Sequence, residues 1–350
     1  MSHPFDRQEL RQLLRRQDRV PAALMPTPLH EAKRLREVIG GPRVFLKRDD
    51  LTGYAFGGNK TRNLEFRLAH AVLERADVLV MALEITSNSA RQTVAAANKL
   101  GMRTVLVLKG ERPKVIQGNL LVNYLLGAEV HYAADEREQS LIIEQVRDRV
   151  SHEGLRPLVL TSEPIFNVGS ALAYLEMTLE LLEQTDGLGL RPDYLYMTSG
   201  GKGQAGLVLA KKLLGAGFRV HGVTVNEEYD VAPRTAQIAN DAASFLGLDV
   251  TISPTDVINF DGFVGEGYGI PTDEGFEAIE LLAQTEGVIL DPIYTGKCFA
   301  AILSHIRSGL VPNDSIVVFV HTGGTPAIFS FADEILARID ARSGKVAREA

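Results

Sequence analysis

The sequence predicts an α/β protein with helices on both faces of mainly parallel β-sheets. Two observations carry this prediction. Short apolar segments rich in β-branched residues, the pattern of buried parallel strands, alternate with longer amphipathic segments of helical periodicity. Strands that alternate with helices in this way form βαβ units, whose helices cover both faces of a sheet.

The expected elements follow from these segments in chain order. The strands read ADVLVMAL (76–83), TVLVLKG (104–110), AEVHYA (128–133), PLVLTSE (157–163), DYLYMTS (193–199), FRVHGVTVN (218–226) and DSIVVFVHTGG (314–324). The helices between them are expected at 61–74, 89–101, 114–127, 136–153, 168–186, 204–216, 233–246, 274–286 and 296–308, and several are followed by glycine. Ligands bind such folds at the carboxyl ends of strands, so we expect chemistry in the loops after residues 83, 199 and 320.

Composition narrows the function classes. The 350 residues carry 37 Lys+Arg against 44 Asp+Glu, a formal net charge of −7, which does not favour nucleic acid as a partner. The basic stretch from Arg11 to Arg19 is better explained as the solvated face of a helix. No run of about 18 apolar residues is available for a membrane span, and the polar N-terminal segment does not read as a secretory signal.

Cys298 is the only cysteine in the sequence, so no intrachain disulfide can form and a cysteine-based metal site would lack ligands. We therefore expect a cytoplasmic protein with no metal site. Cys298 is more simply explained by packing than by redox chemistry, and His321 by ordering of a loop.

Lys60 is the first candidate for chemistry. It follows a flexible turn, 54–58, and stands where a helical pattern begins. The partial positive charge of a helix N-terminus disfavours an ammonium group there and eases its deprotonation to a nucleophilic amine. The alternative is a solvated lysine after a loop.

The segment 198–206 is the second candidate, because it lies between an apolar strand and a helix. Successive backbone N–H groups at such a turn form a cradle for a phosphate. Gly201, Gly203 and Gly206 also match G-x-G-x-x-G, with Glu227 and Glu228 about twenty residues further on, so a dinucleotide site stays open as an alternative.

The segment 86–92 is the third candidate site. Its hydroxyl and amide side chains lie at the expected start of a helix, where they could bind a carboxylate. A simple helix cap would also explain it. The segments 291–297 and 321–326 lie at comparable positions and are equally compatible with a structural role.

Taken together, these segments resemble the 1-aminocyclopropane-1-carboxylate deaminase and D-cysteine desulfhydrase family of fold-type II pyridoxal-phosphate enzymes. The resemblance extends from Pro26 to Ala327, and its most specific pieces are KRDD (47–50), GGNKTR (57–62), SN with RQ (87–88 and 91–92), GYGIP (267–271) and EGVILDPIYTGK (286–297). It implies a two-domain, tryptophan synthase β-like fold, with a large domain at 1–51 plus 166–350 and a smaller inserted domain at 52–165. It also implies a homodimer, with pyridoxal 5'-phosphate between the domains and a small amino acid as substrate.

The resemblance assigns roles to individual positions. Lys60 matches the lysine that binds the cofactor covalently and moves protons at the substrate Cα. Catalytic roles are implied for Lys60, Ser87, Tyr268 and Tyr294; cofactor contacts for Asn59, Lys60, Asn88, Gly200, Gly201, Lys202, Gly203, Gln204 and Thr295; and substrate contacts for Ser87, Asn88, Ser89 and Tyr268. The two tyrosines could exchange protons only if their pKa fell well below about 10.

Thr295 distinguishes between reactions. A glutamate stands at this position in the cyclopropane deaminases, where its charge makes the cofactor ring a strong electron sink. The neutral threonine suits α,β-elimination from a β-substituted alanine, as in D-cysteine desulfhydrases, because the β-substituent leaves at once. L-cysteate sulfo-lyase and cyclopropane deaminase activities remain alternatives.

The chain also departs from the family pattern at 83–86, at Lys202 and Gly203, where a small residue and a threonine are usual, and at 162–170. These departures suggest a leaving group other than a plain thiol. From other classes, a nucleotide-binding protein that uses Gly201 to Gly206 and a catalytically silent amino-acid binder stay open.

Overall fold

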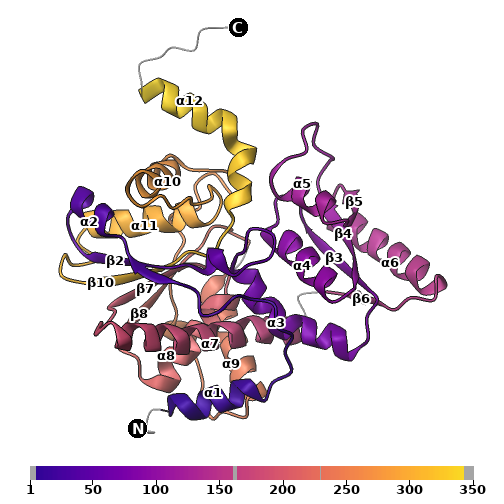
Figure 1. The fold of residues 1–350 in the computed structure, drawn as a ribbon, viewed down its shortest axis with the longest axis horizontal. Coiled ribbons are helices and arrows are strands. Elements are labelled where there is room, and N and C mark those ends of the chain that lie inside the picture. Colours follow the sequence, from indigo (N-terminus) through magenta and orange to yellow (C-terminus); the bar gives the residue numbers. More distant parts are fainter. Residues whose placement is uncertain (1–4, 161–163, 229, 343–350) are drawn as a thin grey trace.

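Two β-sheets organise residues 5–160, 164–228 and 230–342, the part of the chain that the computed structural model describes (Figure 1). The larger sheet has the strand order β1-β2-β10-β7-β8-β9. Its strands are β1 (Leu29–Glu31), β2 (Arg43–Lys47), β7 (Tyr194–Thr198), β8 (Arg219–Val223), β9 (Ile258–Phe260) and β10 (Ile316–Val320). Only the β1–β2 pair is antiparallel; Val318 of β10 lies opposite Phe45 of β2 and Leu195 of β7 in parallel register.

The smaller sheet is parallel throughout, in the order β5-β4-β3-β6. Its strands are β3 (Val78–Glu84), β4 (Arg103–Lys109), β5 (Glu129–Ala133) and β6 (Pro157–Val159). Alternate residues face opposite sides: Leu79 and Leu106 pack with α4 (Asn88–Lys99), whereas Val78 and Val105 pack with α6 (Glu136–His152). Helices therefore cover both faces of this sheet, as the sequence predicts.

The larger sheet is covered in the same way. Leu195 and Val318 pack with α7 (Pro164–Gly187), α8 (Lys202–Leu214) and α9 (Val231–Phe245) on one face. Tyr196 and Phe319 pack with α10 (Asp273–Glu286) and α11 (Thr295–Arg307) on the other, so that the two groups of helices sandwich the sheet in Figure 1.

Helix α3 (Asn59–Leu73) connects the two sheets. Its Leu64 and Leu68 belong to the core of the smaller sheet, while Phe66 joins the core that contains α7. Arg62 of α3 is 1% exposed and pairs with Asp49 at 2.9 Å and with Glu180 of α7 at 2.9 Å. Lys47, at the end of β2, bonds the same Glu180. This buried cluster fixes the start of α3 against the larger sheet.

The predicted α/β class and each long predicted helix and strand are confirmed, with shifts at the ends. Helix α5 (Gly118–Leu125), for example, starts four residues after the predicted 114, and residues 161–163 of the predicted strand 157–163 lie outside the described residues. The basic N-terminal stretch overlaps α1 (Arg7–Arg15). Asp6 caps the N-terminus of this helix. Short elements that the sequence pattern did not predict are β1, β2, β9, α2 (Lys33–Ile39), α12 (Ala332–Arg342) and the 3-10 turns Asp49–Leu51, Pro254–Asp256 and Thr325–Phe331.

The smaller sheet lies within 52–165 and the larger sheet outside it; the division into two domains at these boundaries stays a prediction. No helix in the described residues is long and apolar enough to cross a membrane. Across 5–160, 164–228 and 230–342, no three His, Cys, Asp or Glu side chains gather as metal ligands.

Candidate active site

A cavity of about 630 Å³ lies where the carboxyl ends of both sheets meet. Glu84 at the end of β3, Lys109 at the end of β4 and Thr198 at the end of β7 line it, together with Asn226 after β8 and Thr322 after β10. The loops after residues 83, 199 and 320, in which the sequence predicts chemistry, thus converge on one cavity.

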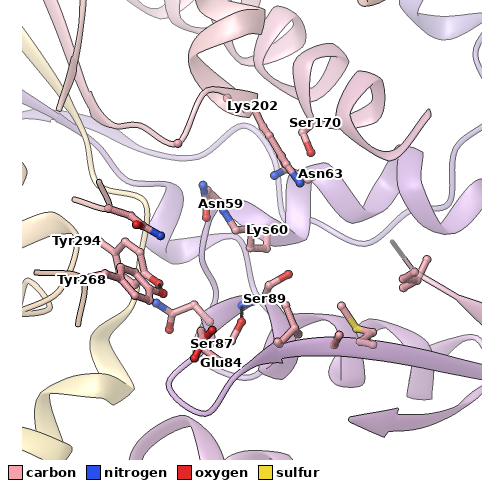
Figure 2. A pocket seen from close by; sticks show the side chains of 18 of the residues that line it. Asn59, Lys60, Asn63, Glu84, Ser87, Ser89, Ser170, Lys202, Tyr268 and Tyr294 are labelled. Carbon is pink, nitrogen blue, oxygen red and sulfur yellow. Dashed lines mark hydrogen bonds between the residues drawn. The ribbon is translucent and has the colours of Figure 1, made fainter. Parts of the chain in front are cut away.

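Most of the residues expected in the site line this cavity, namely Asn59, Lys60, Ser87, Asn88, Ser89, Gly200, Lys202, Gly203, Tyr268 and Tyr294. Gly201, Gln204 and Thr295 do not. Figure 2 shows Lys60 in the middle, with Ser87 and Ser89 on one side, Lys202 on another, and the two tyrosines on a third.

Lys60 is held by the turn that precedes α3. Gly58 begins the helix with φ +127°, and its N–H and carbonyl both bond Thr52 Oγ1. Gln92 of α4 accepts hydrogen bonds from the N–H and the hydroxyl of Thr61, at 2.9 and 3.0 Å. Arg91 of α4 donates to the carbonyls of Ala55 and Gly57. Side chains of α4 thus bond the backbone on both sides of Lys60. These hydrogen bonds fix the backbone from which Lys60 projects into the cavity.

The electrostatics of Lys60 favour a neutral amine. Burial in the cavity wall lowers its pKa from 10.5 to about 8, and the charge of Arg67 acts in the same direction. The sequence predicts easier deprotonation of Lys60 from its position at a helix N-terminus. Loss of hydration on burial acts in the same direction, because it disfavours the ammonium form. An amine with this pKa can attack a carbonyl carbon near neutral pH.

The start of α4 faces Lys60 from the smaller sheet. Ser87 caps the helix, and its Oγ accepts from the N–H groups of Ser89 and Ala90 at 3.2 and 3.3 Å. The helix-cap interpretation is thus confirmed, and the same side chain also lines the cavity. Asn88 Oδ1 accepts from Asn119 Nδ2 at 2.8 Å, which leaves the Asn88 amide nitrogen as a donor. A helix N-terminus with these donors suits a carboxylate.

The loop at the start of α8 forms a second anion-binding end. Ala205 is the first residue to make the helical bond, to Gly201 O at 2.9 Å, so the N–H groups just before it lack intrahelical partners. The N–H of Gly201 is the exception among the loop donors, because it donates to Ser199 Oγ at 3.1 Å. A Cβ at Gly203 would lie 2.8 Å from Met197 Cε and 3.2 Å from Tyr174 Cδ2, so the threonine usual in the family would be crowded here. Burial, then the charges of Arg67, Lys60 and Arg234, lower the pKa of Lys202 to about 7.

Gln204 and Gly206 turn away from the cavity. Gln204 Nε2 donates to Ile258 O at 2.8 Å, and its side chain packs against Gly222. A Cβ at Gly206 would lie 2.2 Å from Ala171 O of α7. The last glycine of the G-x-G-x-x-G match therefore serves helix packing, and the match does not require a dinucleotide.

Tyr268 and Tyr294 form the third side of the site and share a hydrogen bond between their hydroxyls. Burial and the neighbouring Tyr268 raise the pKa of Tyr294 well above its usual value. The lowered pKa that would let Tyr294 act as a base is therefore not found, and its hydroxyl stays protonated.

Thr295 lies behind Tyr294. Its hydroxyl donates to Asp291 Oδ1 at 2.6 Å and accepts from Asp291 N–H at 2.8 Å. Asp291 also accepts from the N–H groups of Ile293 and Tyr294, at 3.0 and 2.9 Å. The Thr295 hydroxyl is thus used to fix the turn that carries Tyr294. His321 similarly orders its loop, as expected, because its Nδ1 accepts from Gly323 N–H at 3.3 Å.

Sequence reasoning missed the cavity residues Asn63, Arg67, Asn226 and Arg234; it singled out the segments that contain Ser170 and Thr322 without assigning a role to either residue. Asn63 and Arg67 follow Lys60 by three and seven residues, a spacing that places all of them on one face of a helix. That spacing was a usable signal for α3. Thr322 comes two residues after the end of β10 (Ile316–Val320), in a loop where the sequence predicts chemistry.

The donor set fits the cofactor that the resemblance implies. Lys60 offers an amine of lowered pKa for an aldehyde carbon, and the start of α8 offers N–H groups and Lys202 for a phosphate. Among the described residues, neither Lys60 nor Lys202 has a carboxylate within ion-pair distance. An anionic ligand of this kind is therefore complementary to the cavity.

Comparisons with known proteins agree with this geometry. Residues 20–323 match the model of a family described as pyridoxal-phosphate dependent enzyme. The crystal structure of an ACC deaminase homologue is similar, with a TM-score of 0.82 and 30% sequence identity over 94% of this chain and 98% of that one. The crystal structure of the T.th. threonine deaminase has a TM-score of 0.61 and 24% identity over 91% and 97% of the two chains, a likeness that shows the fold alone.

Proposed function

The chain belongs to the pyridoxal-phosphate dependent enzyme family, and on that premise we propose that it catalyses α,β-elimination from a β-substituted alanine. The substrate takes up one water and yields pyruvate, ammonia and the protonated leaving group, as in D-cysteine desulfhydrases. The arrangement that supports this proposal is Lys60 between the start of α4 and the Tyr268–Tyr294 pair, with a neutral threonine after Tyr294.

When bound, pyridoxal phosphate supplies an electron sink for the bond that breaks at the substrate Cα. Lys60 would hold it covalently, and Asn88 would donate to its phenolic oxygen. The N–H groups of Gly200, Lys202 and Gly203 and the Lys202 side chain would hold its phosphate, while Gly201, whose N–H bonds Ser199 Oγ, would shape the turn. Asn59 would lie beside the cofactor. Each of these residues lines the cavity, except Gly201.

Ser87, Asn88 and Ser89 bind the substrate carboxylate in this proposal. They lie at the start of the 12-residue helix α4, where the helix dipole favours negative charge. Fixing the carboxylate there turns the substrate Cα toward Lys60 and its side chain toward the tyrosines. Because the substrate Cα is then held next to Lys60, proton transfer between them does not depend on an encounter in solution.

Lys60 removes the proton from the substrate Cα. With a pKa of about 8 its amine is partly unprotonated near neutral pH, as a general base requires. The hydroxyl of Tyr294 donates a hydrogen bond to the departing β-substituent, because its raised pKa keeps it protonated. Full transfer of this proton requires that the bound cofactor and substrate lower that pKa. Tyr268, hydrogen-bonded to Tyr294, orients that proton and contacts the substrate.

The neutral Thr295 favours elimination over opening of a cyclopropane ring. Its hydroxyl is already bonded to Asp291, so it brings no negative charge to the cofactor ring. A weaker electron sink suffices when the electron pair at Cα expels the β-substituent at once.

The testing experiment presents the purified protein with D-cysteine, L-cysteine, L-cysteate, 3-chloro-D-alanine and 1-aminocyclopropane-1-carboxylate. Pyruvate from a β-substituted alanine, lost in Lys60→Ala, is the expected result. Production of 2-oxobutyrate from the cyclopropane substrate would show ring opening and contradict the proposal of elimination. A yellow protein that converts none of these substrates would favour the silent amino-acid binder.

L-cysteate is a specific second candidate, because the cavity end near Lys202 also contains Arg67 and Arg234. A sulfonate leaving group would be attracted by such cations. If Lys202→Ala weakened cofactor binding and left the substrate preference unchanged, Lys202 would have no role toward the leaving group.

We also propose that the enzyme is a homodimer in the cytoplasm. A dimer interface is supported by exposed apolar side chains on α5, the 3-10 turn Thr325–Phe331 and α12, which a second copy of the chain would cover. Leu125 is 84% exposed, Phe329 63% and Leu336 57%. Light scattering of the wild type and of Leu125→Lys tests this surface, since the variant should shift toward monomer. The cytoplasmic location rests on the single cysteine of the sequence.

A further inference from the structure

One face of α3 carries three polar side chains into the cavity, Lys60, Asn63 and Arg67. At 1.5 Å per residue, the Cα of Arg67 lies about 10 Å along the helix from that of Lys60. The long Arg67 side chain packs against Phe166 and Gly169 of α7 and lines the same cavity as Asn63 and Lys60. Arg67 therefore extends the site beyond the residues already considered.

Arg67 is buried and has no anionic partner among residues 5–160, 164–228 and 230–342. It is 8% exposed, and its Nε has no hydrogen-bond partner. Its guanidinium lies 5.6 Å from the centre of the Phe166 ring, and no carboxylate in the described part of the chain pairs with it. Burial lowers its pKa to about 10. An unpaired buried cation is unfavourable, so an anion is expected to complete the site.

Lys202 approaches the same place from α8. In Figure 2 its side chain extends toward Asn63 and Ser170, on the opposite side of Lys60 from Ser87 and Ser89. Arg67, Lys202, Asn63 and Ser170 all line the cavity, and Asn63 Oδ1 has no hydrogen-bond partner. The positive charge of Arg67 repels those of Lys60 and Lys202 and so contributes to the lowered pKa of both lysines.

We propose that Arg67 and Lys202 form a side-chain clamp on the phosphate of the cofactor, with Asn63 and Ser170 as neutral hydrogen-bonding partners. The ligand chemistry is that of a phosphate monoester dianion, whose two charges match the two cationic side chains. The clamp adds to the N–H groups at the start of α8, which by themselves carry only partial charge.

The clamp accounts for two features of this chain. Lys202 stands where the family has a small residue, and Gly203 where it has threonine, so a charged side chain replaces a neutral hydroxyl as phosphate ligand. The clamp also couples cofactor binding to Lys60: before the cofactor binds, the charge of Arg67 lowers the pKa of Lys60, and the phosphate then neutralises that charge.

The test measures dissociation constants of the full-length protein by visible absorbance for two probes, pyridoxal phosphate and pyridoxal, which lacks the phosphate. Arg67→Met and Lys202→Met should each weaken pyridoxal phosphate binding about tenfold to a hundredfold, the range of a charge-assisted hydrogen bond. Binding of pyridoxal should weaken less than that of pyridoxal phosphate, because pyridoxal loses only the effect of the Arg67 charge on Lys60, and Arg67→Lys should recover part of the loss. Lys109→Met is the matched control, since Lys109 lines the same cavity but is paired with Glu84 at 2.9 Å.

Equal weakening of both probes would overturn the clamp and leave Arg67 a structural role. Unchanged cofactor affinity with a raised KM for L-cysteate alone would also overturn it, and would assign the cations to the substrate. Binding requires no turnover, so the result is independent of the reaction proposed above. Thermal unfolding of each variant identifies a misfolded protein; if Arg67→Met misfolds, Arg67→Lys supplies the measurement at that position.

Discussion

The hydroxyl groups of Tyr268 and Tyr294 share one hydrogen bond although 26 residues separate them in sequence. Tyr268 lies on the loop before α10, and Tyr294 immediately precedes α11. Their rings meet edge to face, with centroids 6.0 Å apart. When Tyr268 is the donor within the pair, the hydroxyl proton of Tyr294 is left for a ligand in the cavity.

Tyr294→Phe is expected to lower kcat for pyruvate formation about a hundredfold, the lower range for loss of a general acid. Phenylalanine keeps the ring and removes only the proton donor. The Tyr124–Tyr132 pair, whose hydroxyls are 2.9 Å apart on the surface, offers a matched control in Tyr124→Phe. An unchanged kcat in Tyr294→Phe would remove this residue from proton transfer.

The rate of cofactor loading should depend on pH through Lys60. Below pH 8 its ammonium form predominates and cannot attack the aldehyde; above pH 8 the neutral amine predominates. The rate constant of the rise in visible absorbance should therefore increase with pH and level off just above about 8, whereas an ordinary lysine would level off near 10.4. A rise that continues to about pH 10 would contradict the lowered pKa of Lys60.

The fold could be predicted because its long elements carry their own signals. The strands of both sheets are continuous β-branched runs, and the intervening helices alternate apolar and polar faces. The carboxyl-end rule then placed the loops after β3, β7 and β10 at one site. Lys60 and Ser87 could be located because each stands at the start of a helix, a position marked by the preceding turn.

What the sequence could not predict depends on contacts between distant segments. Strand β2 is only five residues long and is fixed by its pairing with β10, near the other end of the chain. Gln204 turns to the backbone of Ile258, 54 residues further along the chain, a partner that no local pattern specifies. Arg67 reads as an ordinary helical residue until α7 buries it.

Arg62→Met should lower the free energy of unfolding by about 3 to 5 kcal/mol, as expected when one partner of a buried ion pair is removed. The variant leaves the carboxylates of Asp49 and Glu180 without the guanidinium that pairs with both. Urea unfolding measures the effect. Arg34→Met is the matched control, because Arg34 is 66% exposed and its pair with Glu37 is solvated; a change below about 0.5 kcal/mol is expected there. Equal effects in the two variants would show that the buried cluster does not stabilise the fold.

Gly206→Ala tests whether that glycine serves packing or a ligand. Its Cβ would lie 2.2 Å from the backbone carbonyl oxygen of Ala171, so α7 and α8 must separate to admit one methyl group. We expect a loss of about 1 to 3 kcal/mol in the free energy of unfolding, the usual cost of overpacking. Gly217→Ala is the control, because nothing lies within 4 Å of its Cβ position. Since Gly206 does not line the cavity, the dissociation constant for pyridoxal phosphate should stay within about twofold of the wild type, well below the effect of losing one hydrogen bond to a charged group. A variant of normal stability that binds the cofactor poorly would instead assign Gly206 to the ligand.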